Sequence, residues 1–379
     1  MNITFLTSGH EPYDDRIFYH LARTFSYKGW NVEIVSSKMD LKLTNEGISI
    51  NCFYGDKFDK REKIRGFTER LSLSHPDIII CSEPLPLIAA KRYVKKQDRI
   101  VKIVYDITEW YPSKKNLEGL NFFVQLFLVV KLTMFNFFAS AKTDAFIFGE
   151  YYKSRPYRFL FPNKPSVDIT YYPDNKYIRR IEPTLVENKL RLCFSGRISL
   201  EKGFGHFMKV LEGLSRENKE RTFQVKIIGR YETQQDQNEC KPLIDRLDEN
   251  IVISFHEKQP LMQFLELISD TDIFLDLRSD DFENNHCLPI KLFYYCALGR
   301  PVIFTNLKAI RREVEVQKFG YLVKPDNTEQ IVKIISMYLT DNRLYNNHCS
   351  NARSLFEINY NWKKIEPELL DFIDEISSR

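Results

Sequence analysis

The chain alternates short apolar runs with longer amphipathic stretches, and this alternation is what most constrains its fold. Runs of this kind are typical of parallel strands that are buried on both faces. The stretches between them place apolar residues on one helical face, as over residues 16–28. Strands alternating with helices predict a doubly wound α/β sheet. The strands expected in the first half are Ile3–Leu6, Val32–Val35, Ile78–Cys81 and Ile100–Tyr105.

The same alternation starts again at Leu190, after a segment rich in Pro, Asp, Asn and charged residues at Pro173–Lys189. A length of 379 residues is too great for one compact core, so we expect two α/β domains with a cleft between them. We place a first domain at 1–175, a linker at 176–189, a second domain at 190–358 and a closing helix at 359–379. The second half has expected strands at 190–194, 225–228, 251–255, 273–277 and 301–304, and a helix at 204–214.

Composition excludes several classes of protein. A chain with 43% hydrophobic and 28% charged residues is neither disordered nor a polytopic membrane protein. A net charge of +4 argues against nucleic-acid binding. Seven cysteines without a C-x-x-C pair argue against a disulfide framework or a structural zinc site, and favour reduced thiols. The first residues lack the basic region of a signal peptide, so we expect a cytosolic protein.

One segment, Asn121–Ala139, is almost wholly apolar and rich in phenylalanine. Three interpretations are open. It is a buried helix of the first domain, or a helix whose apolar face meets a bilayer, or a transmembrane helix, which the central Lys131 disfavours. Three lysines nearby would help membrane binding: Lys114, Lys115 and Lys142.

Residues 195–203 form a loop between a predicted strand and a predicted helix, where α/β folds bind ligands. Gly196 and Gly203 permit close approach of the backbone. Arg197 and Lys202 are placed to meet phosphate oxygens, and the helix N-terminus favours anions. The alternative is a surface turn with solvated charges.

A second stretch, residues 288–303, reads Leu-Pro-Ile-Lys-Leu-Phe-Tyr-Tyr-Cys-Ala-Leu-Gly-Arg-Pro-Val-Ile and predicts a helix ending at Gly299 before a strand. Together with the 195–203 loop it resembles the donor-binding half of family 4 glycosyltransferases (glycosyl transferases group 1), which are retaining enzymes of GT-B fold. Three further segments carry the resemblance across the chain: His10–Phe18, Tyr105–Pro112, which is similar to Y-D-x-H-E-x-Y-P, and Asn359–Trp362.

The resemblance implies a GT-B fold with two Rossmann-like domains, the closing helix returning to the first. It implies retaining transfer of a sugar from a nucleotide-sugar donor to a lipid-linked glycan acceptor in bacterial surface polysaccharide biosynthesis. No metal or other cofactor is expected, because basic side chains neutralise the diphosphate leaving group. The protein would work in the cytoplasm, at the inner face of the cytoplasmic membrane.

The resemblance also suggests site residues. The catalytic candidates are Arg197, Lys202 and Glu109. The donor-binding candidates are Gly196, Arg197, Lys202, Gly229, Asn285, His286, Leu288, Lys291 and Tyr294. The acceptor-binding candidates are Gly9, His10, Asp15, Arg16 and Thr108.

At several positions the chain differs from the family pattern. Tyr294 stands where the family has a ribose-binding glutamate, and a phenol cannot accept two hydroxyl groups as a carboxylate does. Thr108 stands where the family has a histidine. The missing carboxylate would come from Asp280, Asp281 or Glu283.

Other interpretations of these residues stay open. One of Asp14, Asp15 and Arg16 would cap the helix that follows, instead of meeting the acceptor. Glu109 would form a buried ion pair. The whole chain would be a nucleotide-sugar epimerase of the same fold, or a catalytically silent partner of an active transferase, for which Tyr294 is the best support.

Overall fold

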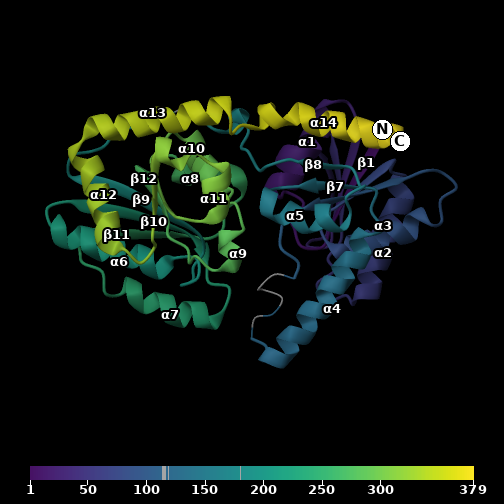
Figure 1. Ribbon diagram of the computed structural model, residues 1–379, viewed down its shortest axis with the longest axis horizontal. Helices are drawn as coiled ribbons and strands as arrows, with labels where there is room; N and C mark the ends of the chain where they lie inside the picture. The colour runs from purple at the N-terminus through teal and green to yellow at the C-terminus, as the bar shows by residue number, and fades with distance from the viewer. Residues whose placement is uncertain (113–116, 118, 180) are drawn as a thin grey trace. The chain divides into compact units, whose positions relative to one another are not determined.

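The computed structural model describes residues 1–379 except 113–116, 118 and 180. The chain divides into two compact units, one formed by residues 1–171 and 365–379 and the other by residues 172–364. Each unit is a largely parallel sheet with helices packed on it (Figure 1). The expected α/β fold class is confirmed. The segment expected to be a linker, 176–189, falls within the second unit.

The described residues of the first unit form an eight-stranded sheet in the order β3-β4-β2-β1-β5-β6-β7-β8. Every neighbouring pair is parallel except β3 and β4. The pattern of apolar runs finds β1, β2, β5 and β6 and misses the other four. The strands are β1 (Asn2–Thr7), β2 (Asn31–Ser36), β3 (Leu41–Asn45), β4 (Ile48–Cys52), β5 (Ile78–Cys81), β6 (Lys102–Ile107), β7 (Ala145–Phe148) and β8 (Ser166–Asp168).

The helices of this unit begin with η1 (Asp15–Ala22), which continues into α1 (Arg23–Tyr27) and confirms the predicted helix. Asp14 caps it, because one carboxylate oxygen accepts from the backbone N–H groups of Arg16 and Ile17 at 3.0 and 3.2 Å. The chain's last helix also packs here, where Thr24 donates to Glu366 at 3.0 Å. The remaining helices are α2 (Lys60–Ser74), α3 (Pro84–Val94), α4 (Phe122–Ser140), α5 (Tyr151–Leu160) and α14 (Trp362–Ser378).

The described part of the second unit has a parallel sheet of six strands in the order β11-β10-β9-β12-β13-β14. Its strands are β9 (Lys189–Arg197), β10 (Thr222–Arg230), β11 (Ile251–His256), β12 (Ile273–Asp276), β13 (Val302–Thr305) and β14 (Gly320–Val323). Its helices are α6 (Phe204–Glu217), α7 (Gln234–Ile244), α8 (Leu261–Ile268), α9 (Phe282–Asn285), α10 (Lys291–Ala297), α11 (Lys308–Glu313), α12 (Thr328–Thr340) and α13 (Asn342–Ile358), with short 3₁₀ turns η3 (Asn175–Tyr177) and η4 (Val316–Lys318). One boundary differs from the expected one, because β9 continues through Gly196 and Arg197.

Helix α4 contradicts the interpretation of Asn121–Ala139 as a buried helix. Its buried residues are only Asn136, Ala139 and Ser140, all near the C-terminal end. By length and composition α4 could cross a membrane, and it is the only such helix among the described residues. Of the lysines expected to assist it, Lys142 is exposed, whereas Lys114 and Lys115 lie outside the described residues.

A buried ion pair joins η1 to the middle of the first sheet. Arg16 is 2% exposed, and its guanidinium donates to the two carboxylate oxygens of Asp106 at 2.8 and 2.7 Å. It also donates to the carbonyl of Ile169 at 2.7 Å and lies 4.5 Å from the centre of the Tyr171 ring. The expected acceptor contact of Arg16 is therefore wrong, because its charge and its donors are used inside the unit.

We expect Arg16→Met to lower the free energy of unfolding by about 3–5 kcal/mol, because Asp106 would stay buried without its partner. Urea denaturation followed by circular dichroism measures this change. The control is Arg65→Met on α2, where the guanidinium is 72% exposed and lies 3.9 Å from Glu69. That change should cost less than about 1 kcal/mol. Equal losses in the two variants would contradict a structural role for the buried pair.

Candidate functional site

The site of the second unit begins where β9 and β10 end side by side. Gly196 and Arg197 pair in register with Gly229 and Arg230. A Cβ atom at Gly229 would lie 1.8 Å from the carbonyl oxygen of Gly196, so no other residue fits there. A Cβ atom at Gly196 would lie 2.7 Å from Nζ of Lys291. The two glycines therefore let β9 and β10 approach each other and leave room for the Lys291 ammonium.

The loop that follows β9 leads into the N-terminus of α6. The hydroxyl of Ser199 accepts from the backbone N–H of Lys202 at 3.2 Å. Gly203, with φ of 84°, is the N-cap residue of α6 and has no side chain with which to cap the helix. The first turn of α6 therefore offers backbone donors and the positive end of the helix dipole to an anion.

A cavity of about 150 Å³ opens at this carboxyl edge of the sheet. Four of its residues are basic and one, Asp276, is acidic. Four of the candidates, Gly196, Arg197, Lys202 and Lys291, come together there. The lining residues are Phe194, Ser195, Gly196, Arg197, Lys202, Leu275, Asp276, Arg278, Lys291 and Tyr295. The carboxyl ends of parallel strands are where open α/β sheets bind ligands.

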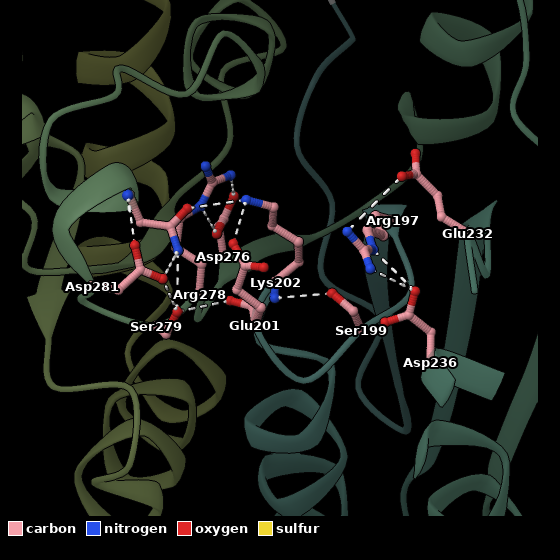
Figure 2. A network of polar contacts seen from close by, with 11 residues as sticks. Arg197, Ser199, Glu201, Lys202, Glu232, Asp236, Asp276, Arg278, Ser279 and Asp281 are labelled. Atoms are coloured by element: carbon pink, nitrogen blue, oxygen red, sulfur yellow. Dashed lines mark hydrogen bonds and ion pairs between the residues drawn. The ribbon is translucent and has the colours of Figure 1, made fainter. Parts of the chain in front are cut away.

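Two of the basic side chains are held by neighbouring acidic or amide groups. Arg197 donates to Asp236 of α7 from Nε and Nη2 at 3.0 and 2.9 Å, and Glu232 lies 3.9 Å away. The ammonium of Lys202 contacts Glu201 at 3.2 Å and donates to Asn284 at 3.1 Å. Figure 2 shows Arg197 turned toward Glu232 and Asp236, and a dashed line that joins the ammonium of Lys202 to Glu201. An incoming anion would compete with these carboxylates for the two cations.

Sequence reasoning missed Asp276 and Arg278, which form a bidentate pair at the end of β12. Nε and Nη2 of Arg278 donate to the two oxygens of Asp276 at 2.7 and 2.5 Å. Burial raises the pKa of Asp276, but the charges of Arg278 and Lys291 outweigh it and hold the pKa below its usual value. One sequence signal could have found the pair. It is a charged residue at the end of a buried strand, followed closely by a second charged residue.

Burial also perturbs the pKa of Lys291. Its ammonium donates to the carbonyl of Ser195 at 2.5 Å. Burial lowers the pKa of Lys291 to about 8, with Asp276 opposing the shift and the charges of Arg278 and Lys202 adding to it. The ammonium therefore loses its proton only slightly above neutral pH.

The other donor candidates lie outside the set of residues that line this cavity. An oxygen of Asn285 accepts from the backbone N–H of Lys308 at 3.2 Å, and Nδ1 of His286 contacts the carbonyl of Phe282 at 2.7 Å. Leu288 is buried. Tyr294 is 3% exposed, with its ring edge-to-face against Phe264, and the neighbouring Tyr295 lines the cavity instead. The donor roles of these four residues remain predictions.

The loop after β1 places two of the acceptor candidates, Gly9 and His10, around Glu83. The carboxylate of Glu83 accepts from the hydroxyl of Thr7 at 2.8 Å and from the backbone N–H groups of Ser8 and Gly9 at 2.8 and 3.1 Å. His10 lies beside it, with Nε2 3.6 Å from a Glu83 oxygen. Sequence reasoning missed Glu83, because this interaction joins residues 75 positions apart.

His10 lies between two carboxylates, Glu83 and Asp14. Its Nδ1 is 3.0 Å from an oxygen of Asp14. Burial lowers the pKa of His10, but the hydrogen bond to Asp14 and the charges of Asp14, Glu83 and Glu109 together raise it to about 10. His10 is thus an imidazolium at neutral pH, which can donate to an oxygen but cannot act as a general base.

Three further candidates of the first unit are Asp15, Thr108 and Glu109. An oxygen of Asp15 is 3.4 Å from Nδ1 of His20. Thr108 is buried after β6, and its carbonyl accepts from the ammonium of Lys153 at 2.5 Å. Glu109 is exposed, so its interpretation as a buried ion pair is wrong. The acceptor and catalytic roles of these residues remain predictions.

None of the seven cysteines is paired in a disulfide, and six of them are buried. Within the described ranges, no group of three or more His, Cys, Asp or Glu side chains is placed to hold a metal ion. That the reaction needs no metal remains a prediction.

Comparison with known proteins connects the second unit to one family. Residues 177–355 match the family model described as Glycosyl transferases group 1. An uncharacterized glycosyltransferase of Methanocaldococcus jannaschii, MJ1069, is 24% identical over 178 residues. That match takes in 47% of this chain and 43% of the relative, so the chain spans less than half of the relative's length.

Solved structures show the fold of the whole chain. Sucrose-phosphate synthase from Thermosynechococcus elongatus has a TM-score of 0.74 at 14% identity, over 100% of each chain. Anabaena HepE in complex with UDP-glucose has a TM-score of 0.69 at 14% identity, over 98% of this chain and 99% of its own. WaaG, a glycosyltransferase involved in lipopolysaccharide biosynthesis, has 0.67 at 14% identity, over 96% and 98%. The chain has the GT-B fold.

We expect the affinity of the cavity for a diphosphate anion to fall by about tenfold between pH 7 and pH 9. Because the pKa of Lys291 in the folded protein is about 8, its positive charge is present below pH 8 and lost above it. Calorimetric titration with nucleoside diphosphates measures this dependence. Lys291→Met should bind more weakly with a flat profile. Equal slopes in the variant and the wild type would rule out Lys291 as the titrating group.

We also expect the stability of the protein to depend on the charge of His10. The pKa is about 10 in the folded protein and about 6.5 in the unfolded chain, so the stabilisation is complete below pH 6.5 and disappears as the pH rises through 10. The free energy of unfolding of the wild type, measured in urea between pH 6 and pH 10, should therefore fall relative to that of His10→Gln. Parallel profiles would show that His10 is not held as a cation.

Proposed function

We propose that this chain, whose residues 177–355 belong to the group 1 glycosyltransferases, transfers a sugar from a nucleotide-sugar donor to a glycan acceptor. The observation that carries the proposal is the cavity at the carboxyl edge of the second sheet, where Arg197, Lys202, Arg278 and Lys291 converge. A nucleoside diphosphate gains negative charge as its bond to the sugar breaks. Cations fixed in advance at that place lower the energy of the transition state.

The chemistry of the leaving group follows from these cations. Arg197 and Lys202 neutralise the departing diphosphate, with the first turn of α6 adding backbone donors. Lys291 adds a third charge beside the end of β9, and Arg278, held by Asp276, keeps that carboxylate from repelling the phosphates. Such a set of basic groups would take the place of a metal ion. That the configuration at the anomeric carbon is retained is inferred from the family resemblance.

The first unit would hold the acceptor at the loops that follow β1 and β6. His10, as a permanent cation, would donate to an acceptor hydroxyl or to a sugar oxygen. Glu109 is exposed after β6 and free to accept from the sugar being transferred. Gly9, Asp15 and Thr108 would shape this surface, whereas Arg16 holds it from beneath through Asp106.

The finer assignment is a lipid-linked acceptor in the biosynthesis of a bacterial surface polysaccharide, such as capsule or lipopolysaccharide. The protein would be cytoplasmic and act at the inner face of the membrane. Two similarities support this: WaaG is involved in lipopolysaccharide biosynthesis, and HepE was solved with UDP-glucose, which makes a UDP-sugar the first donor to test. The exposed apolar helix α4 supports work at a membrane.

Transfer is favoured over epimerisation at the same site. An epimerase needs catalytic carboxylates near the anomeric carbon, but Asp276 is the one acidic residue that lines the described cavity, and both of its oxygens are bound to Arg278. Incubation of the donor without acceptor separates the two activities, since an epimerase would release an altered nucleotide sugar.

We expect Arg197→Ala and Lys202→Ala each to raise the barrier to transfer by about 2–4 kcal/mol while the fold stays intact. The donor is first selected by thermal shift, because a bound nucleotide stabilises the folded protein. Turnover is then measured with that donor and a membrane extract as acceptor. The matched control is Arg216→Ala, an arginine of α6 that is 74% exposed and should leave turnover unchanged. Near-normal turnover in either cavity variant would contradict the assignment of that residue to phosphate binding.

A further inference from the structure

The N-terminal half of α4 exposes most of its apolar side chains. We define the apolar tip as residues Phe122–Val130. Its side chains at 122, 123, 124, 126, 127 and 130 are between 39% and 80% exposed. Successive helical residues are about 100° apart, so this set covers a little more than half of the circumference, and the remaining face carries the half-buried Gln125, Leu128 and Val129. The tip's one polar side chain, Gln125, is occupied by donating to the carbonyl of Leu120 at 2.9 Å.

The C-terminal half of α4, in contrast, is fixed to its unit. Asn136 accepts from the hydroxyl of Tyr105 at 3.3 Å and donates to the hydroxyl of Tyr157 at 2.7 Å. Ala139 belongs to the buried core. Lys164 donates to the last carbonyls of the helix at 2.6–2.9 Å. This half cannot leave the protein without losing buried contacts, so α4 is not free to cross a membrane.

Figure 1 shows the tip projecting beyond α2 and α3, away from the sheet of its unit. Between Leu120 and Thr143 the sequence holds no acidic residue. Its charged side chains are Lys131, which directly follows the tip, and Lys142, and both are exposed. An apolar tip followed by a lysine complements a bilayer, whose hydrocarbon covers all faces of a helix and whose head groups attract the cation.

We propose that the apolar tip inserts end-on into the hydrocarbon region of one bilayer leaflet, with Lys131 at the level of the head groups. A helix of this length extends about 13 Å, close to half of the roughly 30 Å hydrocarbon thickness of a bilayer. This differs from an amphipathic helix lying flat on an anionic surface, because the tip carries no charged residue and its one polar side chain, Gln125, is half-buried and already hydrogen-bonded. Insertion is driven by apolar burial, so it does not depend on anionic lipid.

Flotation with vesicles tests the proposal without any donor or acceptor, so its failure would leave glycosyl transfer untouched. We expect binding to neutral phosphatidylcholine vesicles that persists in 0.5 M salt, roughly the range in which surface charge attraction is screened. The triple variant Phe122→Ser, Phe123→Ser, Phe127→Ser should bind at least about a hundredfold more weakly, since each lost aromatic contact is worth about tenfold or more. The control is Leu73→Ser on α2, 74% exposed but outside the tip.

Insertion depth is measured separately with Phe123→Trp, which keeps the tip apolar. Lipids brominated deep in the acyl chain should quench its fluorescence more than lipids brominated near the head group. The proposal is overturned if quenching is shallow, if binding requires anionic lipid, or if salt releases the protein. It is also overturned if the triple variant turns a dimer into a monomer without any vesicle binding, because the tip would then meet a second copy.

Discussion

The contact between Gly196 and Gly229 is the constraint on which the cavity depends. It brings the last residues of β9 and β10 so close that a single methyl group at Gly229 would strike the Gly196 carbonyl at 1.8 Å. That approach places Arg197 at the end of its strand and opens the space that the Lys291 ammonium fills. Each basic residue of the cavity lies at or near the point where a strand of the second sheet ends or a helix of that unit begins.

Gathering positive charges in one cavity is unfavourable, and neighbouring carboxylates offset part of this repulsion. Asp236 and Glu232 face Arg197, Glu201 faces Lys202, and Asp276 is bound to Arg278. Lys291 has a carbonyl as its hydrogen-bond acceptor, and burial lowers its pKa. Glu232 and Glu201, whose side chains are 30% exposed, yield to an incoming anion more readily than Asp276, which is 11% exposed. The cations are therefore held in place before a ligand binds, and the negative charges of an incoming anion can replace those of the carboxylates.

The sequence was sufficient to predict structural features that depend on local pattern. It was insufficient for features that depend on contacts between residues far apart in the chain. The central strands of both sheets, a helix cap from among Asp14, Asp15 and Arg16, and the grouping of Gly196, Arg197, Lys202 and Lys291 could be predicted. The edge strand β3 could not, because its residues are mostly exposed and form no apolar run. Glu83 and Arg278 were missed because their roles depend on which strand ends are neighbours. Arg16 was misassigned because its partner, Asp106, lies 90 residues away.

Helix α4 also shows what sequence analysis cannot decide. Its apolar composition was evident from the sequence, but its environment in the folded protein was not. The apolar run fits a buried helix as well as an exposed one, and only the packing of α3 and α5 around Asn136 and Ala139 decides which residues are covered. The covered half ties the helix to the fold, and the bare half exposes aromatic surface whose contact with water is costly. Burying that surface in hydrocarbon recovers the cost, and the polar anchoring of Asn136 and Lys164 limits how far the helix can enter. A chain built this way would meet a membrane through one helix end.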